Sequence, residues 1–131
     1  DQLNAFAEDL QIVVSVLPLT PDTTGIIDTG FLNRITPGAF VINGGRGRQI
    51  VDDHLLAALD SGHVGGAALD VFATEPLPQT HRYWTHPNVR VWPHVAAQTN
   101  AETAADQVAA AIDSIMAGRQ PKNQVDWARG Y

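Results

Sequence analysis

Four polar side chains that can bind ions or move protons stand where short apolar runs of the sequence end. They are Arg46, Asp70, Glu75 and His94, and they belong to separate segments of the chain. If the runs are parallel strands, their carboxyl ends meet along one edge of a sheet, where open parallel sheets bind ligands. An arginine, two carboxylates and a histidine on one edge therefore form a candidate active site.

Arg46 and His94 have the chemistry needed to bind and protonate a small oxo acid. A guanidinium offers five donors in a planar fork that suits a carboxylate or a 2-oxo acid, and the flanking glycines let the backbone approach a ligand closely. A histidine at a strand end can carry a proton near neutral pH, as general acid catalysis requires. The alternatives are an arginine in solvent and a partly buried histidine bonded to backbone.

The two carboxylates have different expected tasks. Glu75 lies in a loop before Pro76, and a hydrogen bond that it accepts from His94 would favour the imidazolium form and hold one tautomer. An exposed loop glutamate is the alternative. Aspartate is disfavoured in strands, so Asp70 is expected either to cap a nearby loop or to accept a hydrogen bond from a ligand amide.

The remaining histidines are expected to be solvated, on a helix or in loops. Because His81 and His86 lack a convergent carboxylate, no metal site is predicted. The remaining histidines are His54, His63, His81 and His86.

The elements that must position these residues alternate in type. Apolar runs at 12–17, 39–42, 67–71 and 89–92 predict buried strands, and segments with helical spacing separate some of them. This alternation predicts an α/β domain with a largely parallel sheet. Since the runs are apolar on both faces, we expect helices to cover both faces of the sheet.

Capping residues indicate where the helices begin. Asp28 and Asp52 are each expected to cap a helix between two strands. Thr99 and Glu102 have the spacing of a capping box, which predicts a final helix with one apolar face and Gly118 beyond its end.

Composition excludes several classes of protein. The 131 residues carry a net charge of −6, are 44% hydrophobic and include no cysteine. That length fits one domain with an apolar core, and the lack of cysteine excludes disulfide scaffolds and thiol nucleophiles.

An acidic chain without a basic stripe is not expected to bind nucleic acid. No apolar run approaches the roughly 20 residues that span a bilayer, and residues 1–4 lack the features of a signal peptide, so a cytoplasmic protein without membrane contact is expected.

Four segments, in order and spread over essentially the whole chain, resemble the D-2-hydroxyacid dehydrogenase family. The ending at 124–131, with the Val-Ala-Ala at 95–97, is most similar to the glyoxylate/hydroxypyruvate reductase branch. The resemblance implies a Rossmann-like parallel sheet with flanking helices. The four segments are Leu-Pro-x-Thr-Pro-x-Thr at 17–23, Asn-x-x-Arg-Gly at 43–47, Asp-Val-Phe with Glu-Pro-Leu-Pro at 70–78, and Pro-His-Val-Ala-Ala at 93–97.

The resemblance also implies a role for each site residue. Arg46 would bind the carboxylate of a small 2-oxo acid such as glyoxylate or hydroxypyruvate and polarise the ketone. His94 would donate the proton, and Glu75 would orient the imidazole of His94. Asp70 would hold the nicotinamide carboxamide. The implied coenzyme is NADP or NAD, with NADPH favoured by the branch, and the full-length protein is expected to be a homodimer. The cofactor-binding residues implied are Leu17, Pro18, Thr23, Gly44, Gly45, Arg46, Asp70, His94, Ala96 and Ala97.

One part of the family pattern is missing from the sequence. No strand followed by Gly-x-Gly-x-x-Gly precedes Ile12, and the residue that selects NAD or NADP is also absent. We therefore expect the C-terminal part of such an enzyme, with residues 1–118 in the nucleotide-binding domain and 119–131 as a tail that in the family returns to the substrate domain. A truncated form, a proteolytic product or an incomplete gene would each explain this. Alone, the chain is expected to be inactive and to self-associate through its unpaired sheet edge.

Two other functions remain open at this point. An NAD(H)-sensing, corepressor-like module on the same fold can keep the same residues. A receiver-like signalling domain needs an acidic cluster at the end of the first strand, where Pro18 and Thr20 stand instead. Within the enzyme reading the substrate also stays open, because phosphoglycerate, formate and lactate dehydrogenases share much of this half.

Overall fold

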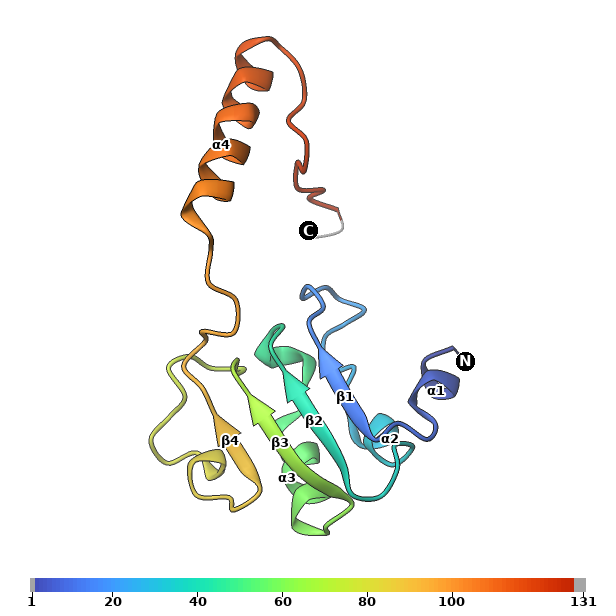
Figure 1. The fold of residues 1–131 in the computed structure, drawn as a ribbon. Helices are drawn as coiled ribbons and strands as arrows, with labels where there is room; N and C mark the ends of the chain where they lie inside the picture. Colours follow the sequence, from blue (N-terminus) through green and yellow to red (C-terminus); the bar gives the residue numbers. More distant parts are fainter. Residues whose placement is uncertain (1, 129–131) are drawn as a thin grey trace. The chain divides into compact units, whose positions relative to one another are not determined.

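A parallel sheet whose strands follow the order of the chain forms the first part of the molecule. The computed structural model describes residues 2–128, and the chain divides after Ala96 into two units, each described here by itself. In the first unit the sheet order is β1-β2-β3-β4, with every neighbouring pair parallel (Figure 1). The strands are β1 (Ile12–Ser15), β2 (Ala39–Asn43), β3 (Val64–Leu69) and β4 (Val89–Val91).

Short helices connect these strands, and the predicted α/β architecture is confirmed. Between β1 and β2 lies α2 (Thr29–Leu32), and between β2 and β3 lies α3 (Asp52–Asp60). Helix α1 (Gln2–Ala7) precedes β1, and two 3₁₀ turns, η1 (Gly47–Gln49) and η2 (Arg82–Trp84), lie in the loops after β2 and β3.

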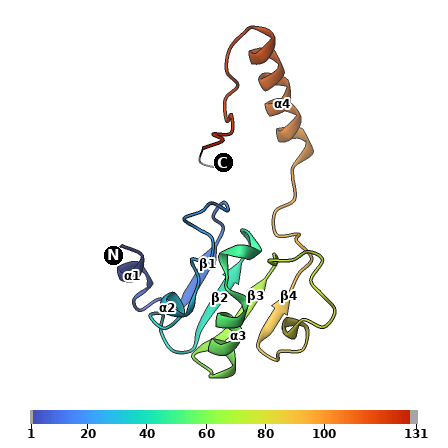
Figure 2. The same ribbon diagram turned by 180° about the vertical axis from the view of Figure 1, so that it is seen from behind.

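The helices of the first unit cover only one face of its sheet, so the expectation of two covered faces is wrong for this unit. Right-handed crossovers that always advance in the same direction along a sheet all lie on the same face. Figure 2 shows α2 and α3 across that face. Burial alternates accordingly along the strands: Val13 is 6% exposed, whereas Val14 is 57% exposed and Phe40 is 53% exposed.

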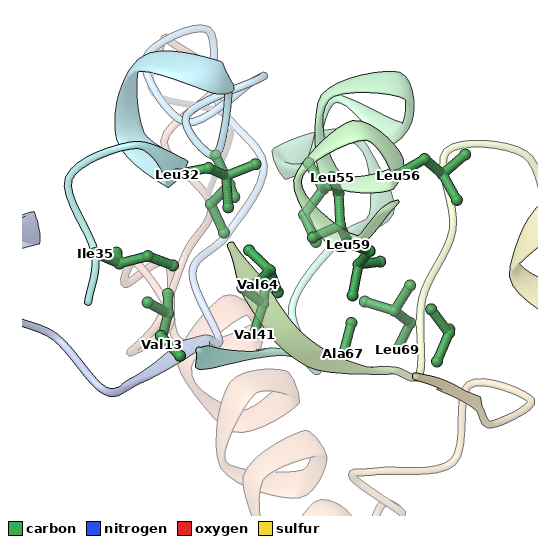
Figure 3. Close-up of a cluster of buried hydrophobic side chains, with 14 of the residues drawn as sticks. Val13, Leu32, Ile35, Val41, Leu55, Leu56, Leu59, Val64, Ala67 and Leu69 are labelled. Carbon is green, nitrogen blue, oxygen red and sulfur yellow. The ribbon is translucent and has the colours of Figure 1, made fainter. Parts of the chain in front are cut away.

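The core fills the layer between the sheet and these two helices. Figure 3 shows side chains from the inner face of the strands meeting side chains from α2 and α3. Fully burying a leucine or valine contributes about 1.5–3 kcal/mol, so this layer carries most of the apolar stabilisation of the unit. Its most deeply buried members include Leu32, Ile35, Val41, Leu55, Val64 and Leu69.

Strand β3 begins three residues before the predicted start because two glycines belong to it. A Cβ on Gly65 would lie 2.4 Å from the carbonyl oxygen of Gly38, so the backbones approach too closely there for a side chain. Glycine is depleted in strands, and for that reason the sequence pattern placed the start at residue 67. Strand β1, at one edge of the sheet, ends at Ser15 rather than at residue 17.

Two of the three predicted helix caps differ from the prediction. Asp28 caps α2 as predicted, because its carboxylate accepts a hydrogen bond of 2.9 Å from the backbone N–H of Phe31. Asp52 does not cap α3, whose N-cap residue is Val51. The Asp52 carboxylate instead accepts a hydrogen bond of 3.0 Å from the hydroxyl of Tyr83, and partial burial raises its pKa.

The second unit contains α4 (Ala101–Met116) and the residues that follow it. The cap is Asn100, one residue after the predicted Thr99, and its side chain accepts a hydrogen bond of 3.0 Å from the N–H of Thr103. As predicted, one side of α4 is apolar and Gly118 follows its end in the left-handed conformation, with φ of 69°. Within residues 2–128, no helix has the length and apolar character needed to cross a membrane.

Candidate active site

The loop after β2 fixes the backbone of Arg46 through a buried asparagine. Asn43 is 1% exposed. Its side-chain oxygen accepts a hydrogen bond of 3.0 Å from the N–H of Gly45, and its side-chain nitrogen donates one of 3.1 Å to the carbonyl oxygen of Arg46. The side chain of Arg46 is exposed and donates to the carbonyl oxygen of Gly45 at 2.7 Å. The backbone that carries the guanidinium is thus held in place, and the guanidinium has further N–H donors with which to bind an anion.

Gly47 lets the loop after β3 pack against the Arg46 loop. A Cβ at this position would lie 1.8 Å from the carbonyl carbon of Phe72, so only glycine fits here without moving the backbone. The loop that continues from Phe72 carries Glu75. This close approach therefore brings the arginine and the glutamate, 29 positions apart in the sequence, to the same edge of the sheet.

His94 and Glu75 form the predicted hydrogen bond. The imidazole Nδ1 donates to Oε2 of Glu75 over 2.9 Å, and Oε1 of the same carboxylate accepts a hydrogen bond of 2.9 Å from the N–H of Phe72. These two bonds, the one from His94 foremost, lower the pKa of Glu75 below its ordinary value. The pair is open to solvent, with side chains 51% and 38% exposed. With Nδ1 bonded to this carboxylate, the other ring nitrogen, Nε2, is left available to a ligand.

The backbone of His94 is held in an unfavourable conformation. Its φ of 58° lies in the left-handed region, which costs energy for residues other than glycine and persists only where surrounding contacts impose it. The contacts come from Asp70, whose carboxylate accepts hydrogen bonds of 2.8 Å from the N–H of Val95 and 2.9 Å from the N–H of Ala96. Asp70 thus caps this loop, one of its two expected tasks, and its contact with a nicotinamide stays a prediction.

One cavity brings the three predicted catalytic residues together. It has a volume of about 250 Å³ and its walls include Arg46, Glu75 and His94. A larger cavity of about 660 Å³ lies on another side of the same pair and is mostly apolar, with Trp84 and Trp92 in its walls. No arginine lines the larger cavity, so the smaller one offers the better site for an anionic reacting group. The walls of the smaller cavity also include Leu19, Gly47, Arg48, Phe72 and Ala73.

Most of the residues implied in coenzyme binding line the same edge of the sheet. A Cβ on Gly45 would lie 3.0 Å from the carbonyl oxygen of Leu17, and one on Gly44 would lie 3.7 Å from the Cβ of Ala96. Gly45 is therefore a neighbour of Leu17, and Gly44 is a neighbour of Ala96. Ala97 belongs to the second unit.

Thr23 has a structural task that the sequence did not indicate. Its hydroxyl donates to the carbonyl oxygen of Pro18 over 2.8 Å and accepts a hydrogen bond of 2.8 Å from the N–H of Thr20. It thus closes the turn that follows β1. Any contact of Thr23 or Pro18 with a coenzyme stays a prediction.

Gln49 was missed by the sequence analysis, although it is fully buried at 0% exposure beside the Arg46 loop. Its side chain bonds to Ser15, Leu17, Pro18 and Arg46. The available signal was weak: an uncharged polar residue directly before the apolar pair at 50–51.

The expectation of four solvated histidines is wrong, because each has a structural partner. The imidazole of His86 is 8% exposed. The expected lack of a nearby carboxylate is also wrong, because Nε2 of His81 lies 3.7 Å from Oδ2 of Asp52 and Nε2 of His86 lies 3.5 Å from Oδ1 of Asp60. Among residues 2–128, no group of three or more histidines, cysteines or acidic residues could hold a metal ion. The bonds are His63 to the Leu32 carbonyl oxygen, and His54, His81 and His86 to the N–H groups of Thr29, Tyr83 and Asn88.

Comparison with protein families gives a match over most of the chain. The model described as "D-isomer specific 2-hydroxyacid dehydrogenase, NAD binding domain" matches residues 1–96. Two curated relatives, each named glyoxylate/hydroxypyruvate reductase A, match all 131 residues: that of Serratia proteamaculans at 45% identity and that of Yersinia enterocolitica at 44%. The match covers 42% of each relative, so the chain spans about two fifths of their length.

Solved structures confirm the Rossmann-like fold. A D-isomer specific 2-hydroxyacid dehydrogenase from Xanthobacter autotrophicus, in complex with NADPH and MES, superposes with a TM-score of 0.94 at 44% identity, over 98% of this chain and 53% of that chain. The NADPH-dependent glyoxylate/hydroxypyruvate reductase of Sinorhizobium meliloti, in complex with NADP and sulfate, gives a TM-score of 0.91 at 39% identity, over 98% of this chain and 42% of that chain.

Proposed function

We propose that this chain, which belongs to the D-isomer specific 2-hydroxyacid dehydrogenase family, provides the catalytic residues of an enzyme that reduces a small 2-oxo acid to the D-2-hydroxy acid. The observation that carries the proposal is the 2.9 Å contact between His94 and Glu75 in the wall of a cavity that Arg46 also lines. A proton donor and a carboxylate-binding group are the two things that such a reduction requires of a protein.

Each residue has a defined task in the proposed reaction. Arg46 binds the carboxylate of the oxo acid and stabilises the negative charge that develops on the ketone oxygen. His94 gives the proton on Nε2 to that oxygen, and Glu75 holds the ring in place by Nδ1. General acid catalysis of this kind is worth about a hundredfold to ten-thousandfold in rate.

The residues at the edge of the sheet fit a nicotinamide coenzyme. Gly44 carries no side chain and neighbours Ala96, so a flat ring could approach the backbone there. When bound, a nicotinamide coenzyme supplies the hydride to the ketone carbon. The NADPH and NADP in the solved relatives favour NADPH over NADH for this chain.

The organisation of the whole protein is part of the same proposal. Residues 1–118 would belong to the coenzyme domain, and residues 119–131 would form a tail that contacts a substrate domain. The relatives named glyoxylate/hydroxypyruvate reductase favour glyoxylate and hydroxypyruvate as substrates, and we expect a homodimer.

The test is an assay of the protein expressed at the full length that its gene encodes. We expect oxidation of NADPH that depends on glyoxylate or hydroxypyruvate, and weaker activity with pyruvate or phosphohydroxypyruvate. In His94→Gln, turnover should fall about a hundredfold to ten-thousandfold, and Arg46→Lys should raise the KM for the oxo acid because a single ammonium cannot replace the planar fork.

Arg34→Lys is the matched control, since Arg34 lies in an exposed turn before β2 and outside the cavity. A full-length protein that binds NADPH but reduces none of these acids would instead support a coenzyme-sensing module. Unchanged rates in His94→Gln or Arg46→Lys would remove that residue from its proposed task.

A further inference from the structure

We propose that Gln49 is a positioning residue that holds the loop after β1 and the Arg46 loop in fixed relation. The kinetic part of this inference rests on the proposed function, because it assigns the two loops to the coenzyme side and the substrate side of one site. Gln49 lies at the end of η1 and is 0% exposed, so its amide can bind only protein groups.

All the hydrogen-bonding capacity of this amide is used. Oε1 accepts hydrogen bonds from the hydroxyl of Ser15 at 2.8 Å and from the N–H of Arg46 at 3.1 Å. Nε2 donates to the carbonyl oxygens of Leu17 at 2.9 Å and Pro18 at 3.2 Å. A primary amide has two donor hydrogens and two acceptor sites, and each one here has a partner.

The pattern of partners fixes the orientation of the amide. A flipped side chain would place its NH₂ against the N–H of Arg46 and its oxygen against two carbonyl oxygens. Gly45 leaves the space for this arrangement, since a Cβ there would lie 2.6 Å from Oε1 of Gln49 and 3.0 Å from the carbonyl oxygen of Leu17. The amide therefore determines where the Arg46 backbone stands relative to Leu17 and Pro18.

Three of the four bonds of Gln49 fall into two sets with different consequences, and the fourth is to Ser15 in β1. Those to Leu17 and Pro18 hold the loop implied in coenzyme binding, and that to Arg46 holds the residue implied in substrate binding. Neither His94 nor Glu75 is among its partners. Loss of the amide should therefore weaken binding on both sides of the site without altering the proton donor.

The first test compares Gln49→Met with Ser15→Ala in the full-length protein. Methionine keeps the length of the side chain and makes none of the four bonds. We expect the KM for the oxo acid and the Kd for NADPH each to rise about tenfold to a hundredfold, because small displacements of binding groups have effects of this size. The pH dependence of kcat should not change. Ser15→Ala removes the one bond that holds neither loop, so it should lower thermal stability and leave KM and Kd unchanged.

The second test uses Gln49→Glu. A carboxylate still accepts the bonds from Ser15 and Arg46 but has no hydrogen for the two carbonyl oxygens, whereas the protonated acid can donate to one of them. Burial raises the pKa of a carboxyl group, so protonation falls in an accessible range. The KM of this variant relative to wild type should decrease as pH is lowered, while the same ratio for Gln49→Met should not depend on pH.

Wild-type KM and Kd in folded Gln49→Met would overturn the inference, as would a KM ratio for Gln49→Glu that does not depend on pH. A wild-type protein without oxo-acid reduction would refute the proposed function instead. Amide hydrogen exchange then decides the question for Gln49: faster exchange in Gln49→Met at the N–H of Arg46, but not at that of Phe72, would support the positioning task. An equal change in exchange rate at both N–H groups would refute the positioning task.

Discussion

The apolar layer beneath the sheet and the polar edge at the carboxyl ends of its strands are stabilised in different ways. In the layer, side chains such as Leu55 and Leu59 from α3 pack against Val41 and Val64, and dispersion and burial act without direction over many neighbours. At the edge, Asn43, Gln49 and Asp70 each hold particular backbone groups by particular bonds. Small losses in the layer are shared among neighbours, whereas a single loss at the edge leaves a buried polar group without a partner.

Stability and the geometry of the candidate site therefore reside in different regions of the same unit. The layer determines whether the chain folds, and the edge determines where Arg46, Glu75 and His94 stand. Three substitutions test this separation, in order of decreasing expected effect.

Leu55→Ala should have the largest effect on stability. Leu55 is 0% exposed, and removing a buried leucine side chain to alanine costs about 2–5 kcal/mol, because burial is lost and a cavity remains. Denaturant unfolding measures the loss. The separation predicts an unchanged KM in the fraction that stays folded, so a raised KM there would show that the layer also shapes the site.

Asp70→Asn should have an intermediate effect that falls mainly on catalysis. An amide retains one acceptor for Val95 or Ala96 but presents its NH₂ to the other N–H, which frees the loop that carries His94. Hydrogen bonds to a charged group are worth about 1.5–3 kcal/mol, so the variant should also lose stability. We expect the kcat of the full-length protein to fall because the loop that carries His94 is no longer held.

Asp28→Asn is the matched control for this change. Its carboxylate also accepts a backbone hydrogen bond, from Phe31, but lies away from the cavity. It should therefore leave kcat unaltered. Equal losses of kcat in both variants would mean that Asp70 contributes only to folding.

Loss of the pairing between Glu75 and His94 should have the smallest effect on stability, and this effect should appear at acidic pH. Because the pKa of Glu75 in the folded protein is lowered from its ordinary 4.5, the pair stabilises the fold above pH 4.5 and this contribution is lost as pH falls through the lowered pKa. Both side chains are well exposed, so the contribution is at most about 1 kcal/mol.

His94→Gly tests this assignment, since glycine tolerates a left-handed backbone and has no side chain to bond to the carboxylate. Carboxyl NMR titration should show the pKa of Glu75 moving back toward 4.5. The bond from the N–H of Phe72 should keep the return incomplete. An unmoved pKa would exclude His94 as its main cause.

The sequence was sufficient for the parallel sheet, the polar edge and the contact between His94 and Glu75. Apolar runs mark strands, and parallel strands bring their carboxyl ends to one edge, so Arg46, Glu75 and His94 follow from local pattern and topology together. The roles implied for these residues and for the coenzyme contacts stay predictions.

What the sequence did not indicate depends on tertiary partners. Asp52 has the type and place of a helix cap, yet the hydroxyl of Tyr83, 31 positions away, competes for its carboxylate. Gln49 lies in a turn without periodicity, so its burial depends on Ser15 and the loop after β1. The uncovered sheet face was missed because an apolar strand does not reveal which face a helix covers.

The left-handed backbone at residue 94 has a consequence for engineering. At φ of 58°, glycine or asparagine would fit the chain better than histidine. A selection for thermostability alone would therefore tend to replace the proposed proton donor, in line with the usual trade-off between robustness and activity. Any effort to raise the thermostability of this protein has to keep His94 and place its stabilising substitutions at other positions.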